Sequence, residues 1–107
     1  AIADYTKYIK LKPKDPDAYL NRADAKYNLK QYHGAIADCI KAIELDPDYA
    51  YAYYTRGDAK FELEDYKGAI ADYTKAIEID PDYALAYNNR GFSKDNLNDL
   101  KCFIFIT

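Results

Sequence analysis

Few side chains in this sequence could act as nucleophiles or bases, and no two of them occur at a spacing typical of a catalytic site. His33 is the only histidine, and Cys39 and Cys102 lie far apart without a Cys-x-x-Cys pair. A nucleophile needs a positioned base beside it, and no Gly-rich phosphate-binding loop occurs. The carboxylates spread along the chain instead of forming a pair for acid–base work. We therefore expect no enzymatic activity, no metal site, no disulfide framework and no cofactor.

The charge and hydropathy of the chain exclude two further classes of partner. The net charge is −3, whereas a nucleic-acid-binding protein is expected to carry a basic patch. No apolar stretch is long enough to span a membrane. We therefore expect neither nucleic acid nor membrane as a partner. The sequence has no signal peptide, which favours a cytoplasmic location.

A 34-residue repeat organises the whole chain. Between residues 16–49 and 50–83, about 21 of the 34 positions are identical, and a period of this length is typical of helical solenoids. The motif Ala-Ile-Ala-Asp begins at residue 1 and recurs 34 and 68 residues later. The repeat divides the chain into a half repeat at 1–15, full repeats at 16–49 and 50–83, and a partial repeat at 84–107.

Each full unit is predicted to contain two amphipathic helices joined by a short turn. Apolar residues from Pro16 to about Leu29 recur at helical spacing, and Pro16 after Asp15 suits the first helical position behind an N-cap. A turn at residues 30–34 precedes a second helix, which ends before Pro47 because a residue that precedes proline disfavours the helical conformation. Breaks are therefore expected near residues 12–16, 30–34, 46–49, 64–68 and 80–83, with no strand in residues 1–97.

The order of large and small residues resembles the signature of the tetratricopeptide repeat (TPR) family. In the second full unit this order is Tyr53, Gly57, Ala69, Tyr73, Ala76 and Pro81. The resemblance implies an all-α fold, a right-handed α-solenoid of antiparallel helix-turn-helix repeats, whose concave face comes mainly from first helices. It also implies that Gly57 and Ala69 let the two helices of one hairpin cross closely.

Both ends of the chain depart from the repeat pattern. Residues 1–12 correspond to a second helix alone. The third unit has a first helix from Ala84 to about Leu97, after which residues 101–107 are mostly bulky and apolar. Such an uncharged, β-prone tail needs cover, so it either folds back over the third unit or meets the start of another molecule. We favour the second alternative, a head-to-tail homo-oligomer, because five apolar residues cannot cover a face that normally meets a full helix.

Recurring charges occupy fixed positions in the repeat. The arginines are Arg22, Arg56 and Arg90 on first helices, and the aspartates are Asp4, Asp38 and Asp72 on second helices. A guanidinium matches a carboxylate with two parallel hydrogen bonds, which favours structural ion pairs. The alternative is a row of arginines that contact a ligand.

By the same resemblance, groove-facing residues of the first helices are the candidates for ligand binding. The predicted peptide-binding residues are Asn21, Asp24, Tyr27, Tyr51, Tyr54, Thr55, Asp58, Phe61, Asn88, Asn89 and Phe92. Asn21 and Asn89 stand where related proteins use asparagine to bond the backbone of an extended peptide. The repeat pattern does not need the aromatic members of the second full unit, so they either form a groove for apolar side chains or pack within the molecule.

One function known in the family does not fit these residues. TPR domains that grip the C-terminal carboxylate of chaperones use a Lys/Asn/Lys/Arg clamp. The matching positions here are Leu20, Asp24, Thr55, Leu85 and Asn89, none of which is basic. We therefore expect a non-catalytic protein-interaction module for a neutral or basic peptide or protein segment. The rival hypothesis is a stacking unit that self-associates through its terminal repeats.

Overall fold

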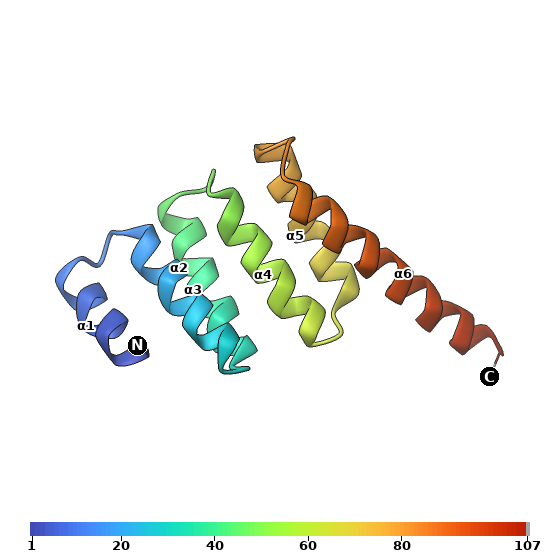
Figure 1. Cartoon of the computed structure of the whole chain (residues 1–107), viewed down its shortest axis with the longest axis horizontal. Helices are drawn as coiled ribbons and strands as arrows, with labels where there is room; N and C mark the ends of the chain where they lie inside the picture. Colours follow the sequence, from blue (N-terminus) through green and yellow to red (C-terminus); the bar gives the residue numbers. More distant parts are fainter. Residues whose placement is uncertain (107) are drawn as a thin grey trace.

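The chain folds into a row of helices that pack as antiparallel neighbours (Figure 1). The computed structural model describes the backbone of residues 1–106 and the side chains of residues 1–100. The helices are α1 (Ile2–Leu11), α2 (Pro16–Asn28), α3 (Tyr32–Leu45), α4 (Ala50–Glu62), α5 (Tyr66–Ile79) and α6 (Ala84–Ile106). No strand occurs in the described backbone, and each helix packs mainly against the next one in the sequence. The predicted all-α repeat solenoid is therefore confirmed.

The helix starts follow the predicted signals in part. Pro16 is the first residue of α2, and the N–H of Asp17 donates a 3.0 Å hydrogen bond to the side chain of the N-cap residue Asp15. The second helices begin earlier than predicted, with α3 starting at Tyr32 instead of Ala35. The reason is that the Tyr32 ring packs edge-on against Tyr27, with ring centroids 5.4 Å apart. This contact makes Tyr32 part of the hairpin and shortens the turn.

Small residues set the distance between the two helices of a hairpin. An added Cβ at Gly57 would lie 2.8 Å from Cε1 of Tyr73, so only glycine leaves room for that ring. The first unit makes the same contact with a different pair, because Ala23 and Cys39 stand at these positions and both are fully buried. The second full unit thus fills the space between its helices with glycine and tyrosine, whereas the first uses alanine and cysteine.

The predicted structural ion pairs form in both full units. Arg22 donates two hydrogen bonds to Asp38, at 2.9 and 2.7 Å, and Arg56 makes the same pair of bonds to Asp72. In the third unit this prediction is wrong. The repeat places Ile106 at the aspartate position, and Arg90 instead donates to the hydroxyl of Thr74 at 3.3 Å.

The third unit also differs from the prediction in its backbone. The sequence predicts a first helix that ends near Leu97, but α6 continues to Ile106, and its C-terminal part extends away from the other helices (Figure 1). No glycine or proline follows Gly91 to stop it, and Phe103 stands where the full units have a fully buried alanine. A returning hairpin needs a small residue there, so the tail does not fold back over the third unit. The side-chain contacts of residues 101–107 lie outside the described residues.

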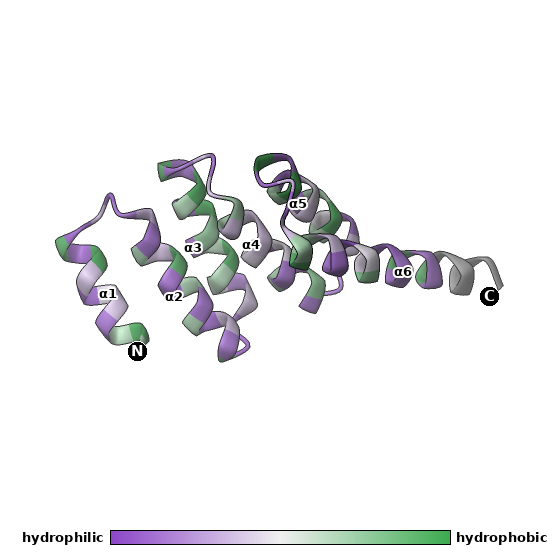
Figure 2. Ribbon diagram, turned by 45° about the horizontal axis from the view of Figure 1, so that its top comes forward, coloured by the Kyte–Doolittle hydropathy of each residue, from purple (hydrophilic) through white to green (hydrophobic). Residues whose placement is uncertain are grey.

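The two kinds of helix differ in hydropathy. Figure 2 shows that α3 and α5 carry the more hydrophobic residues, whereas α2 and the coloured part of α6 are largely hydrophilic. Both kinds of helix nevertheless contribute to the core, to which the second helices supply residues such as Ala35, Cys39, Ala69, Tyr73 and Ala76. The first helices bury one face in this core and present polar and aromatic side chains at the surface.

Candidate functional site

The first helices form a shared surface, because α4 contacts both α2 and α6. Two adjoining pockets lie on this surface. A pocket of about 180 Å³ is lined by Tyr27, Asp58, Phe61, Glu62, Tyr73, Asn89 and Phe92. A second pocket of about 300 Å³ is lined by Asp24, Tyr27, Asn28, Tyr51, Tyr54, Thr55 and Asp58. Tyr27 and Asp58 belong to both, so the two hollows form one groove, which we call the first-helix groove.

Asp58 is the centre of a hydrogen-bond network in this groove. The hydroxyl of Tyr73 and the amide of Asn89, the latter at 3.0 Å, both donate to its Oδ1 atom. The same amide also donates to the Tyr54 hydroxyl at 3.0 Å. Both N–H groups of Asn89 are thus engaged within the protein. A peptide backbone could gain the Asn89 amide donors only by displacing these bonds.

The hydrogen-bond partners of the Asp58 carboxylate are all neutral side chains. Desolvation raises the pKa of Asp58, while hydrogen bonds from Tyr73, Asn89 and Tyr54 oppose that rise. Among the described residues, the ion pairs are made by other carboxylates, namely Asp38, Glu44, Asp72 and Glu78. Asp58 is therefore a half-buried carboxylate without a counter-ion.

Further carboxylates make the first-helix groove acidic. The Tyr51 hydroxyl donates to Asp24 at 3.2 Å, and the Tyr27 hydroxyl donates to Glu62 at 3.4 Å. Desolvation also raises the pKa of Asp24, against the opposing effect of the Tyr51 hydrogen bond. Tyrosine hydroxyls hold these carboxylates in place without neutralising them, so the groove favours a cationic ligand.

Tyr54 and Phe61 of α4 combine the two placements that the sequence left open, because they pack within the molecule and also line the groove. Tyr54 stacks on Tyr83 with ring centroids 5.0 Å apart, and Phe61 packs edge-on against Tyr66 at 5.3 Å. They belong to the partly buried rim of a core cluster, yet both also line the groove. Truncating either side chain is therefore expected to lower the stability of the fold as well as the affinity for a ligand in the groove.

The structure places most, but not all, of the predicted site residues in the first-helix groove. Asn21 lines neither groove pocket but a hollow of about 730 Å³ beside α1, which adjoins the groove at Asp24 and Asn28. Asn88 lines none of these pockets. Thr55 lines the groove although only 4% of its surface is exposed. Sequence reasoning missed Tyr73 because the TPR resemblance assigns it to the hairpin core. Its ring does fill the hairpin, but its hydroxyl reaches the groove carboxylate.

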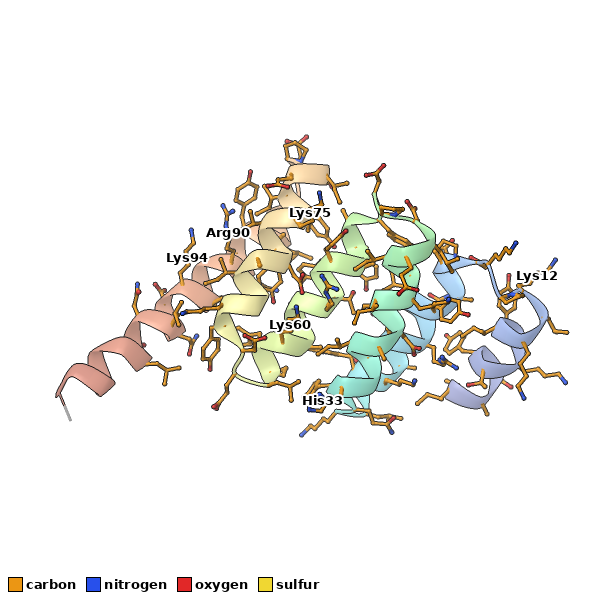
Figure 3. The ribbon with its side chains drawn as sticks, turned by 180° about the vertical axis from the view of Figure 1, so that it is seen from behind. Lys12, His33, Lys60, Lys75, Arg90 and Lys94 are labelled. Atoms are coloured by element: carbon orange, nitrogen blue, oxygen red, sulfur yellow. The ribbon has the colours of Figure 1, made fainter. Side chains whose placement is uncertain are left out.

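The residues that could do other chemistry are poorly placed for it. Burial raises the pKa of the Cys39 thiol to about 12, which keeps it protonated and unreactive at neutral pH. His33 is exposed in the first turn of α3 (Figure 3). In the described part of the chain, no group of three or more His, Cys, Asp or Glu side chains could hold a metal ion. Within the same part, the helices are too short or too polar to cross a membrane.

Comparison with known proteins identifies the repeat. A tetratricopeptide repeat model matches residues 16–49, and a TPR repeat model matches residues 57–94. No curated protein matches the chain by sequence. The first TPR domain of human RPAP3 is 34% identical, with a TM-score of 0.90 over 92% of this chain and 78% of that one.

Two other similar structures contain bound peptides. The first TPR of Spaghetti (RPAP3), bound to the HSP90 peptide SRMEEVD, is 34% identical with a TM-score of 0.89, over 91% of this chain and 77% of that one. The second TPR domain of human RPAP3, in complex with the HSP70 peptide SGPTIEEVD, is 29% identical with a TM-score of 0.84, over 87% and 78%. With its 34-residue hairpins, close-packed small residues and these matches, the chain belongs to the tetratricopeptide repeat family.

Proposed function

We propose that this chain is a non-catalytic protein-interaction module that binds a neutral or basic peptide segment in the first-helix groove. Asp58 carries the proposal, because it is a half-buried carboxylate with no ion-pair partner among the residues that the structure describes. The rings of Tyr27, Phe61 and Phe92 line the same pocket. A lysine or arginine side chain would supply the missing charge and lie against these rings.

The groove differs chemically from what an acidic C-terminal peptide requires. The peptides in the two RPAP3-type structures end in Glu-Glu-Val-Asp. Such a segment would here meet Asp24, Asp58 and Glu62, and like charges brought together at an interface cost several kcal/mol. Of the five clamp positions, Leu20 is only 1% exposed, and none of the five is basic. We infer that the partner is not an acidic carboxyl-terminal peptide.

Self-association through the terminal repeats is a second candidate function. Arg90 favours it, since no residue with a described side chain offers this arginine the carboxylate that Arg22 and Arg56 have in the full units. The two functions use different surfaces, because Asp58 lines the first-helix groove and Arg90 lines neither groove pocket.

A peptide array tests the proposed ligand class. We expect amidated heptapeptides with a central lysine or arginine to bind more tightly than those with leucine, and those with glutamate not to bind. The measurement is fluorescence anisotropy with labelled peptides, and SRMEEVD with a free carboxylate serves as the acidic comparison. Preference for SRMEEVD or for the glutamate peptide would contradict the proposal.

Asp58→Asn tests the carboxylate itself. We expect it to weaken binding of the lysine peptide about tenfold, which corresponds to 1.4 kcal/mol, since the ion pair between ammonium and carboxylate becomes a hydrogen bond from ammonium to a neutral amide. The matched control is Asp48→Asn, which changes an exposed aspartate in the loop before α4 and should leave affinity unchanged. Equal effects of the two variants would mean that net charge, not the pocket, governs binding.

The raised pKa of Asp58 predicts the pH dependence. Binding of a lysine side chain needs the ionised carboxylate, so affinity falls as the pH falls through the raised pKa of Asp58. This loss will begin at a higher pH than for an ordinary aspartate, because desolvation favours the protonated form. Anisotropy titrations across mildly acidic pH measure the effect. In Asp58→Asn the same decline should be absent, and its persistence would assign it to another group.

A further inference from the structure

One face of α6 is uncovered where the equivalent faces of α2 and α4 are packed. Tyr19 and Tyr87 occupy the same repeat position, but Tyr19 is 9% exposed and Tyr87 is 45% exposed. An added Cβ at Gly57 would strike Tyr73 of the hairpin's second helix, whereas an added Cβ at Gly91 meets nothing within 4 Å. This face of α6 is therefore shaped for a second helix.

The same face carries two cations without a carboxylate partner. In the first full unit, Asp38 pairs with both Arg22 and Lys26, the latter at 3.0 Å. In the second full unit, Asp72 likewise pairs with an arginine and, at 3.1 Å, with a lysine. The repeat places Arg90 and Lys94 at these positions in α6, and neither forms an ion pair with a described residue. Figure 3 shows both cations on the same side of α6.

Arg90 makes the same contact with the preceding helix as Arg22 does in the first full unit. It donates to Thr74 of α5 at 3.3 Å, as Arg22 donates to Thr6 of α1 at 3.2 Å. What Arg22 has in addition is the carboxylate on the following helix. The missing contact of Arg90 is therefore a carboxylate from a helix at the second-helix position of the third unit.

Helix α1 has the residues that this position needs. It is a second helix by its place in the repeat, with Asp4 at the position of Asp72 and Tyr5 at the position of Tyr73. Asp4 is exposed and forms no ion pair with a described residue. The second full unit shows that a glycine on the first helix goes with a tyrosine on the second, in the pair Gly57 and Tyr73. Gly91 therefore matches Tyr5.

We propose that α1 of one copy packs against α6 of a second copy and completes its third hairpin. Asp4 takes the place between Arg90 and Lys94 that Asp72 holds in the second unit. The Tyr5 ring lies over Gly91, as Tyr73 lies over Gly57. The contact is head-to-tail, so it adds one copy after another and continues the helical stack.

A charge exchange tests the proposed pairing. Asp4→Lys alone and the double variant Arg90→Glu with Lys94→Glu should each weaken association at least tenfold, because like charges then meet at the contact. A mixture of the two variants should associate again, since lysine on one copy then faces glutamate on the other. Sedimentation velocity across the micromolar range measures both effects. The double variant Lys41→Glu with Lys67→Glu, which alters exposed lysines elsewhere, should associate like the unchanged chain.

A steric variant separates this contact from general charge effects. Gly91→Leu should keep the monomer folded, because the added side chain starts in open space, and it should abolish association by filling the place of Tyr5. Circular dichroism confirms the fold of each variant. Three results would overturn the proposal: an unchanged chain that stays monomeric, association that survives Gly91→Leu, or a variant mixture that does not reassemble. The proposal would also be overturned if α6 bound a helix of a different protein while the chain itself did not self-associate.

Discussion

Gly57→Leu will lower the free energy of unfolding by roughly 3 kcal/mol, the upper end of the range for overpacking a core. A Cβ at this position already lies 2.8 Å from Cε1 of Tyr73, and a leucine adds three more carbons in the same direction. The Tyr73 ring cannot yield easily, because it is 1% exposed and its hydroxyl donates to Asp58. Urea denaturation followed by circular dichroism measures the loss.

Gly91→Leu is the matched control for this substitution. Gly91 stands at the same repeat position, but no atom lies within 4 Å of its added Cβ. We expect no loss of stability in the monomer and a gain of up to about 1 kcal/mol, because leucine is a better helix former than glycine. Equal destabilisation by the two variants would show that contact with Tyr73 does not set the cost.

Asp72→Asn will cost about 2 kcal/mol, because it leaves two cations beside a buried neutral side chain. The carboxylate side chain of Asp72 is 5% exposed, whereas those of Arg56 and Lys60 are 20% and 24% exposed. Solvent at the two cations therefore reduces the penalty below that of a fully buried pair. Urea denaturation at low protein concentration gives the difference.

Asp4→Asn is the control for Asp72→Asn. Both aspartates hold the same repeat position, but Asp4 is exposed and has no ion pair within the described part of one molecule. We expect a change within about 0.5 kcal/mol, as for an ordinary surface substitution. A loss at Asp4 as large as that at Asp72 would mean that the aspartate acts through its own helix and not through the cations.

The repeat made most of the fold predictable from the sequence. Pro16 and Pro47 marked helix boundaries, and the spacing of Arg22 and Asp38 predicted a contact that forms. These features are local or recur at a fixed period, so each unit supports the interpretation of the next. The early start of α3 was missed because it depends on the contact between Tyr32 and Tyr27, which no periodicity indicates.

The third unit shows where repeat-based reasoning stops. The period predicts an end near Leu97, yet α6 continues to Ile106 because no helix-stopping residue occurs there. The missing aspartate at position 106 leaves Arg90 with a hydroxyl partner instead. Both errors came from extending the pattern of the full units to residues that no longer follow it.

The groove was predictable in outline only. The TPR resemblance located its residues, but hydrogen bonds decide what they can do. The resemblance predicts that the Asn89 amide binds a peptide backbone, whereas in the structure this amide donates to Asp58 and Tyr54. The acidic character of the pocket follows from carboxylates on α2 and α4 that the fold brings to one surface, and a linear sequence does not show their shared surroundings.

An NMR titration with the tightest-binding amidated lysine peptide tests the proposed groove most directly. In ¹H–¹⁵N spectra, the account predicts that chemical-shift changes concentrate on α2, α4 and α6. The largest changes should lie near Tyr27, Asp58 and Asn89, which are among the residues that line the 180 Å³ pocket. The changes should be lost in Asp58→Asn and retained in Asp48→Asn. Shift changes concentrated on α3 and α5, or none with any peptide of the array, would contradict the account.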